Sequence, residues 1–499
     1  MKKIYCLSII FISTFSFGQG ENNIWLLGYS TGTDQYTSSQ KATIDFINGT
    51  PSIIPNVRKM KFSGTQGNIS DKNGNLLMSS NGIWIANANG DTMLNGSDLN
   101  PGLFADNHPY GSTIPNGNIF LPFPGDSNKY ALIHQIGNYQ LNLACGELFY
   151  SIIDMSLDSG LGGVMIKNQI ALQDTFCWGL GACKHANGRD WWIVTIKENS
   201  NKLYLTLLTP NGITNVSSQT FPSLISDLGN VSQPVFSNDG NKFAFTTSHW
   251  VGGSSPWNLQ LNYFDFDRCT GNLSNYTALD LSDGNMGVGT AFSKNSEFLY
   301  VATTQHVFQI NTISPIMTFD TVATYDGFLS ATSPTIFGLL YLAEDNKIYI
   351  TSGNYGVDLH IINNPDSAGI ACDVQQHVLH VPCYHDWTVP AHPNSFLGSE
   401  PGSLCDSLTT GISKNLHDFN LSIAPNPSNG NFSLNYLLPQ NKTGVFEIYD
   451  MDGRKVYSQI LSQWSTIGLI TLLNLTTGFY KCVIKSENFW SSKKLVIVE

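Results

Sequence analysis

Histidine and cysteine, which commonly bind transition metals, gather in the segment HVLHVPCYHD. Its four candidate ligands are His377, His380, Cys383 and His385. Neutral imidazole and thiolate both bind zinc. However, residues three apart on a strand point to opposite faces, and the sequence offers no second half-site of matching spacing. We therefore predict no metal site here, but a strand and loop near the end of a domain, with each histidine satisfied by hydrogen bonds.

Two acidic segments, Asp71–Asn75 and Asp265–Asn272, have the composition of calcium-binding loops. A complete loop needs oxygen ligands at fixed alternate positions and a closing bidentate glutamate, and neither segment has one. Asp and Asn are also the residues that tight hairpin turns use. We interpret both segments as turns, and we predict no cofactor.

Tryptophan offers a different chemistry, because an exposed indole ring has an apolar face on which a sugar can stack. The candidates for such ligand stacking are Trp84, Trp191, Trp192 and Trp250. Large rings also fill the space between packed sheets, which is the alternative. Adjacent strand residues face opposite ways. One of Trp191 and Trp192 is therefore expected in the core, and the other is the candidate for exposure.

The elements that must position these residues follow a repeated phrase, which runs from Glu21 to about Gly398. Each copy has a short apolar start, a polar turn, and an apolar or aromatic strand. The six turns are centred on Gly74, Ser127, Gly188, Gly240, Ser296 and Asn346. Neighbouring turns are 50 to 61 residues apart. Such turns reverse the chain between antiparallel strands, and a period near 50 residues without helical periodicity indicates a β-propeller.

The expected number of blades is seven, with six as the alternative. A four-stranded blade cannot bury both of its faces alone, so blades stack around an axis. Six copies can be counted, and the two ends of the domain, Ile24–Gly28 and Trp387–Leu397, could together make a further blade. An array of β-sandwiches would have a period closer to 100 residues, which makes it the less favoured architecture.

The sequence assigns no catalytic residue. It contains neither a G-x-S-x-G elbow nor a P-loop. A propeller brings distant residues together at its axis, so a carboxylate pair for glycoside hydrolysis stays open, although nothing in the sequence selects one. The sequence leaves enzyme activity undecided and favours a protein that is not an enzyme.

The first residues have the pattern of a secretory signal peptide, predicted to span residues 1–18. Lys2 and Lys3 precede an apolar run that ends before Gly18. No later segment is long and apolar enough to be a transmembrane helix. We assign residues 19–398 to the propeller. Residues 399–420, which are rich in Ser, Gly, Pro, Asp and Thr, are predicted to be a linker.

Composition and charge agree with an exported β protein. Charged residues make up 12% of the chain, against about 25% in ordinary soluble domains. The net charge is −12, and no dense basic run occurs. This charge disfavours nucleic acid and anionic membrane surfaces as partners.

The chain has 9 cysteines, of which Cys6 lies in the predicted signal peptide. Export permits disulfides. Cys177 with Cys183, and Cys372 with Cys383, are close enough in sequence to pair. Spacing does not determine connectivity, so buried thiols are an equal alternative.

The last residues, 421–499, have the pattern of a small all-β module. Pro425 and Pro427 fix φ and remove two backbone donors, so the module begins extended or turned. Asn429-Gly430 and Asp452-Gly453 are tight-turn dipeptides between apolar runs.

This tail resembles the type A C-terminal sorting domain of the type IX secretion system of Bacteroidetes. The residues that match the family's sorting motif are Pro425, Asn426, Pro427, Gly430, Phe432, Tyr449, Asp450, Gly453, Gly478, Tyr480, Lys493 and Lys494. The expected fold is an immunoglobulin-like β-sandwich. The resemblance implies that the secretion machinery and its sortase are partners, and that the tail is removed, with the propeller attached to surface lipopolysaccharide or released. The alternative is a β module that only ends the chain.

A second resemblance covers roughly the whole propeller. The opening NNIWLLG and the segments Ile69–Gly96, Leu359–Cys372 and Val389–Gly398 resemble a family of secreted Bacteroidetes propeller proteins. The chain departs from that family at Leu26-Leu27, where an aromatic residue is usual. The resemblance implies a fold and a compartment but no established enzyme activity, so it carries over no catalytic residues.

The sequence therefore predicts a secreted or cell-surface propeller that acts as a binding or display module for a glycan or protein ligand. The alternative function is a secreted polysaccharide hydrolase or lyase with its site in the propeller cleft. A purely structural surface protein is a third hypothesis.

Overall fold

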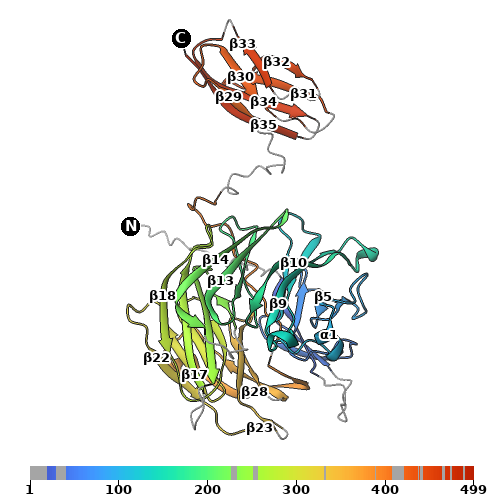
Figure 1. Cartoon of the computed structure of the whole chain (residues 1–499), viewed down its shortest axis with the longest axis vertical. Coiled ribbons are helices and arrows are strands. Elements are labelled where there is room, and N and C mark those ends of the chain that lie inside the picture. Colours follow the sequence, from blue (N-terminus) through green and yellow to red (C-terminus); the bar gives the residue numbers. More distant parts are fainter. Residues whose placement is uncertain are drawn as a thin grey trace, which may run out of the picture. The chain divides into compact units, whose positions relative to one another are not determined.

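The computed structural model describes two compact units, Met1–Thr409 and Thr410–Glu499, and each is considered by itself (Figure 1). The predicted signal peptide lies outside the described residues, as does the larger part of the predicted linker. The described residues are 20–29, 41–225, 233–250, 257–330, 333–353, 355–387, 389–406, 421–436, 438, 442–462, 467–472, 475–486 and 489–498.

Among its described residues, the first unit contains seven sheets of three or four strands in chain order, each an antiparallel meander, and one two-stranded hairpin. The first two have three strands each: β1 (Ile24–Leu27), β2 (Lys41–Asp45) and β3 (Ser52–Asn56), then β4 (Gly67–Ser70), β5 (Leu76–Ser80) and β6 (Ile85–Asn87). The third and fourth have four strands each: β7 (Asn118–Pro122), β8 (Lys129–His134), β9 (Cys145–Asp154) and β10 (Gly163–Phe176), then β11 (Gly181–Lys184), β12 (Trp191–Ile196), β13 (Ser200–Thr209) and β14 (Gly212–Ile225).

The last three sheets of this unit also have four strands each. They are β15 (Val235–Phe236), β16 (Lys242–Trp250), β17 (Trp257–Phe266) and β18 (Leu273–Asp280), then β19 (Gly287–Phe292), β20 (Phe298–Thr303), β21 (His306–Asn311) and β22 (Phe319–Thr324), then β25 (Phe337–Leu342), β26 (Ile348–Ser352), β27 (Gly356–Ile362) and β28 (Val374–His385). The remaining elements are the hairpin β23 (Leu329–Ser330) and β24 (Ser333–Pro334), helix α1 (Leu103–Asn107), and the 3-10 turns η1 (Gly20–Asn22), η2 (Tyr139–Leu141), η3 (Asp158–Gly160) and η4 (Gly369–Cys372).

Hydrophobic clusters between consecutive sheets show that the seven sheets form a closed ring. Each sheet packs against the next through side chains of both, from the first pair of sheets to the last. A further cluster joins the last sheet to the first, where Trp25 of β1 meets Tyr341 of β25 with ring centroids 6.3 Å apart. Each sheet therefore buries both faces against neighbours, which is the arrangement of a β-propeller.

The six repeated turns join the first strand to the second in six of these sheets. Gly74, Gly188 and Gly240 have φ between +71° and +86°, and Ser296 and Asn346 have φ of +64° and +63°. These turn residues adopt the left-handed conformation that the polar turn phrase favours.

The first sheet is completed by the end of the ring domain rather than by a hydrogen-bonded strand. Val389 and Ala391 belong to the same hydrophobic cluster as Trp25. Pro390 and Pro393 lack backbone donors, which explains why this stretch lies against β1 without joining the sheet. The two ends of the domain thus meet in one place.

The second unit is a sandwich of two antiparallel sheets with its own core. One sheet has the order β29 (Ser422–Ala424), β30 (Asn431–Asn435), β33 (Ile467–Thr471), and the other has the order β32 (Lys455–Leu461), β31 (Gly444–Tyr449), β34 (Gly478–Ser486), β35 (Phe489–Ile497). Phe432 and Leu434 from the first sheet pack with Phe446 and Ile484 from the second. Every side chain of this cluster comes from residues 421–497.

Candidate functional site

The ring contains a partly open cavity of about 150 Å³ where the first strands of its sheets converge, here called the central cavity. Residues from many sheets line it, among them Trp25 of β1, Ile119 of β7, Phe292 of β19 and Tyr341 of β25. Pro390–Leu397, which follows the last sheet, supplies another part of the wall. The ends of the ring domain therefore complete the cavity as well as the first sheet.

Residues 389–400, here called the closing segment, are hydrogen-bonded to the first two sheets. His392 Nε2–H donates to the carbonyl of Asn68, 2.8 Å away. Asn22 Nδ2 donates to the carbonyl of Pro393 at 3.3 Å. Because a carbonyl only accepts, the first bond makes Nε2 the protonated nitrogen of His392 and leaves Nδ1 as an acceptor.

Further along, the closing segment is bound to the fourth and fifth sheets. Three hydrogen bonds do this: Asn394 Nδ2 to Asn238 O (2.7 Å), Arg268 Nη2 to Gly398 O (2.6 Å) and Glu400 N to Ala186 O (2.8 Å). A disulfide between Cys269 and Cys405 follows a few residues later. Contacts of the ring thus extend past its predicted end at residue 398 and include the start of the predicted linker.

Few charged side chains line the central cavity. Among the described lining residues, Lys294 and Glu344 are the lysine and the carboxylate, and they interact electrostatically. Burial raises the pKa of Glu344 above its usual range. Burial also lowers the pKa of His392 to about 4, so this imidazole is neutral at pH 7. The lining is therefore close to neutral.

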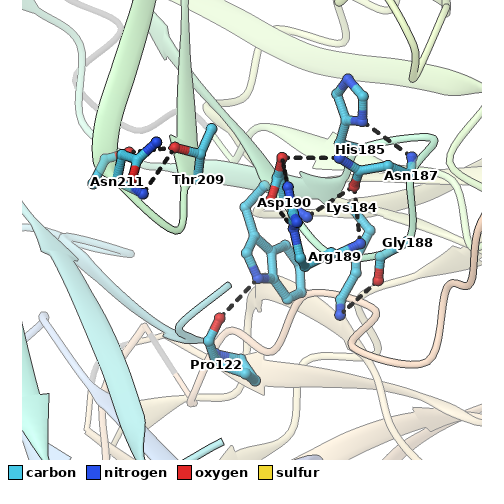
Figure 2. A network of polar contacts seen from close by, with 11 residues as sticks. Pro122, Lys184, His185, Asn187, Gly188, Arg189, Asp190, Thr209 and Asn211 are labelled. Atoms are coloured by element: carbon cyan, nitrogen blue, oxygen red, sulfur yellow. Dashed lines mark hydrogen bonds and ion pairs between the residues drawn. The ribbon is translucent and has the colours of Figure 1, made fainter. Parts of the chain in front are cut away.

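In the turn between β11 and β12, polar side chains form a network of hydrogen bonds (Figure 2). The Asp190 carboxylate accepts hydrogen bonds from Asn187 Nδ2 at 2.8 Å and Arg189 Nε at 2.7 Å. Lys184 Nζ lies 4.8 Å from the ring centroid of Trp191, and Trp191 Nε1 donates to the carbonyl of Pro122 at 3.0 Å. The network fixes the turn and anchors the indole, so we assign it a structural role.

The expected exposure of one tryptophan on β12 is wrong. Trp191 is 0% exposed and Trp192 is 3% exposed. They do face opposite ways, since Trp191 packs with the third sheet and Trp192 with the fifth. Both faces of this sheet are covered by neighbouring sheets, so alternation along the strand exposes neither ring. Trp84 is partly buried against the cluster between the first two sheets, and the side chain of Trp250 lies outside the described residues; ligand stacking by either stays a prediction.

Of the two alternatives left open for four of the cysteines, the structure has buried thiols rather than disulfides. Cys177, Cys183, Cys372 and Cys383 are buried thiols. Cys372 and Cys383 belong to hydrophobic clusters on opposite sides of the last sheet, which separates them despite their short spacing. The disulfide that the structure has, Cys269–Cys405, joins residues 136 apart in sequence, and no local spacing pattern could have indicated it.

The four metal-ligand candidates on β28 have separate partners. His377 Nε2 lies 2.9 Å from Asp326 Oδ2, and His380 Nδ1 lies 2.9 Å from Asp358 Oδ1. His385 is buried and bonded to backbone carbonyls, whereas Cys383 lies in the core. No group of potential metal ligands is assembled within the described part of the chain.

The two acidic segments are turns closed by their own carboxylates. Asp71 Oδ1 accepts from the backbone amides of Asn73 (2.8 Å) and Asn75 (2.9 Å). Asp267 Oδ1 accepts in the same way from the amide of Cys269 at 2.8 Å. These are the local side-chain bonds by which Asp favours turns.

In the second unit, the side chain of Asn426 joins the predicted motif residues at the two ends of the module. Its Oδ1 accepts from the amide of Val496 at 2.9 Å, and its Nδ2 donates to the carbonyl of Lys494 at 2.7 Å. The Ala424–Pro425 and Asn426–Pro427 peptide bonds are both cis. The Pro-Asn-Pro stretch is therefore bonded to the last strand, β35.

The other motif residues occupy turns, the core or the surface of the same module. Gly430 and Gly453 have φ of +100° and +79°, and Asp450 Oδ1 accepts from the amide of Arg454 at 2.9 Å. Phe432 and Tyr480 are buried, and Tyr449 donates to Glu447. Gly478 begins β34, and Lys493 and Lys494 are exposed on β35.

A family model decides what this second unit is. The model for the secretion system C-terminal sorting domain matches residues 422–498. Residues 422–498 are a C-terminal sorting domain. The sorting domain directs export through the type IX secretion system, so the chain reaches the cell surface or the medium. In the described residues, no helix has the length and apolar character needed to cross a membrane.

Comparison with known proteins does not assign an activity to the ring. No curated protein matches the chain. Several solved structures are similar to the chain. One is a periplasmic gluconolactonase of Pseudomonas aeruginosa, with 13% identity and a TM-score of 0.41, over 74% of this chain and 99% of that one. A functionally unknown protein of Desulfotomaculum acetoxidans has 12% identity and TM-score 0.39, over 74% and 99%. PorZ, a surface component of the type IX secretion system of Porphyromonas gingivalis, has 9% identity and TM-score 0.28, over 92% and 73%.

Glu447 gives the sorting domain a pH-dependent contribution to stability. Its carboxylate lies 2.7 Å from Lys485 Nζ and 3.0 Å from Lys455 Nζ. Hydrogen bonds from Lys485, Tyr449 and Lys455 lower its pKa from 4.5 to about 2. The stabilisation is therefore present above pH 4.5 and is lost as the pH falls through about 2.

We expect Glu447→Gln to lower the free energy of unfolding of the sorting domain by about 1–2 kcal/mol at pH 7, because it weakens charge-assisted hydrogen bonds. Thermal unfolding of residues 421–499, followed by circular dichroism from pH 7 to pH 2, measures this difference. The gap between variant and wild type should close toward pH 2. A gap of constant size would contradict the assignment of the effect to this carboxylate.

Proposed function

We propose that this chain is an exported binding protein, whose propeller recognises a ligand non-covalently at the central cavity. Its sorting domain places it at the cell surface or in the medium. There a propeller can act as a rigid frame with its site at the axis, where residues from many sheets converge. The predicted partners of the sorting domain are the secretion machinery and its sortase, which would remove the tail.

The observation that carries this proposal is the chemistry of the cavity wall. Polar uncharged side chains such as Asn116, Gln233 and Asn394 line it together with aromatic rings. Among the described lining residues, the one carboxylate is Glu344. Glycoside hydrolysis generally needs two carboxyl groups facing the scissile bond. The wall thus supports recognition better than the alternative function, a polysaccharide hydrolase.

The test uses the purified chain from residue 19 to residue 499, incubated with a panel of immobilised polysaccharides. Two quantities are measured on the same samples: protein retained on each polysaccharide, and newly released reducing ends. Retention without release is the expected result. Release of reducing ends would establish the hydrolase in its place, and absence of both would overturn glycan binding in favour of a protein ligand or a structural role.

A further inference from the structure

We propose that the central cavity binds one neutral sugar ring, either a free monosaccharide or the end residue of a glycan. This inference rests on the proposed function and names the ligand class for the same site. It follows from three properties of the cavity: its size, the chemistry of its wall, and its near-neutral charge.

The size of the central cavity matches about one ring as the part of a ligand that enters it. The cavity volume is about 150 Å³, and an apolar cavity of about that volume in another protein accommodates benzene. A six-membered ring therefore matches this space, whereas pockets for larger ligands run from about 300 to 1,000 Å³.

A sugar ring presents polar hydroxyls and an apolar C–H face, and the wall has groups that complement both. Asn116 of the wall has an amide nitrogen without a protein partner in the described part of the chain, and such a donor pairs with a hydroxyl. Trp25, Phe236 and Phe292 supply apolar surface for the C–H face of the ring. A purely apolar ligand would leave the unpaired Nδ2 of Asn116 and Nδ1 of His392 still without partners, which costs free energy.

Two side chains of the wall have a polar atom without a hydrogen-bond partner among the described residues. Asn116 is 3% exposed, and its Oδ1 accepts from the Tyr341 hydroxyl at 2.8 Å, which leaves Nδ2 as a spare donor. His392 has Nδ1 as a spare acceptor, since Nε2 donates to Asn68. A hydroxyl both donates and accepts, so it can pair with either atom. Both atoms are buried, so small rotations of these side chains accompany binding.

The charges of the wall favour a neutral ligand. Lys294 and Glu344 have opposite charges and interact with each other. A uronic acid or an amino sugar would bring in a charge that the wall does not balance, and the burial of an unpaired charge is unfavourable. A neutral sugar avoids that cost.

The experiment is calorimetric titration of the chain from residue 19 to residue 499. The probes are glucose, galactose, mannose and N-acetylglucosamine, with glucuronate and glucosamine as charged counterparts. A second arm uses oligosaccharides that end in the sugar found to bind. Equal or tighter binding of the oligosaccharide identifies the glycan end as the ligand, and binding of the free sugar alone identifies the monosaccharide.

Two substitutions address the cavity, and one serves as their control. Ala391→Leu enlarges a partly buried side chain of the wall, and Asn116→Asp removes the spare donor while keeping a residue type that tolerates the φ of +50°. Ala171→Leu is the same alanine change at a partly buried position on β10, outside the wall. Thermal unfolding checks that each variant is folded.

We expect one neutral sugar to bind with a stoichiometry of one, and each cavity substitution to weaken it about tenfold or more, with Ala171→Leu unchanged. Equal binding of the charged counterparts would overturn the inference. Undiminished binding in a folded Ala391→Leu or Asn116→Asp variant would also overturn it. In that case the protein would bind sugars at a surface other than the central cavity. If neither sugars nor oligosaccharides bound, both this inference and glycan binding would be overturned.

Discussion

Replacing Cys269 and Cys405 together by serine is expected to lower the free energy of unfolding of the ring by about 4 kcal/mol. The disulfide joins residues 136 apart, and a crosslink across so long a loop removes much of the entropy of the unfolded chain. The position of the bond adds a second reason. It lies just beyond the closing segment, which completes both the first sheet and the wall of the central cavity.

Chemical denaturation of the purified chain, followed by intrinsic fluorescence, measures this change. Addition of a reductant to the wild type should reproduce the effect, whereas the double variant should not respond to reductant. The six buried thiols of the described residues supply the internal control, since they are the same in both proteins. Equal stability of the oxidised wild type and the double variant would show that the closing segment is held by its other contacts alone.

The fold was accessible to sequence reasoning because its determinants are local. Each repeated turn, such as those at Gly74 and Asn346, combines residues that tolerate positive φ with a strand that follows at once. The same holds for Asn429-Gly430 and Asp452-Gly453 in the sorting domain. Such signals act between near neighbours in the chain, and their spacing then limits the number of architectures.

The central cavity was not accessible in this way, because its determinants are not local. His392 meets Asn68, and Asn394 meets Asn238, only after the ring has closed. The same reason explains the error at Trp191 and Trp192, and why the sequence left the cysteines undecided. Alternation along a strand says which face a residue takes, but the burial of that face depends on the neighbouring sheet. Short spacing between two cysteines likewise says nothing about a sheet that lies between them.

Asn426 lies between these two cases, because the sequence predicted its importance but not its contacts. Sequence resemblance identified the residue, but its physical role needed the structure, because its partners Lys494 and Val496 are about 70 positions away. Its two hydrogen bonds join the beginning of the sorting domain to its end. The motif is thus assembled by folding, and a partner that recognises it would meet both ends of the domain together.

Deletion of residues 421–499 is expected to abolish surface display while the propeller remains folded. The sorting domain is the part of the chain that directs export, and its hydrophobic core is formed by residues 421–497 alone. The clusters that close the ring draw their side chains from residues before 400. Loss of the tail therefore removes the export signal without removing any core residue of the propeller.

The measurement combines cell fractionation with protease accessibility on intact cells, for the full chain and the truncated chain. The truncated chain should be found in the periplasm, protected from external protease, and it should unfold at the temperature of the propeller in the full chain. As the control, residues 421–499 fused to a signal peptide and a periplasmic reporter should carry the reporter to the surface. Normal display of the truncated chain would mean that the propeller itself contains an export signal. A truncated chain that fails to fold would mean instead that the two units depend on each other, despite their separate cores.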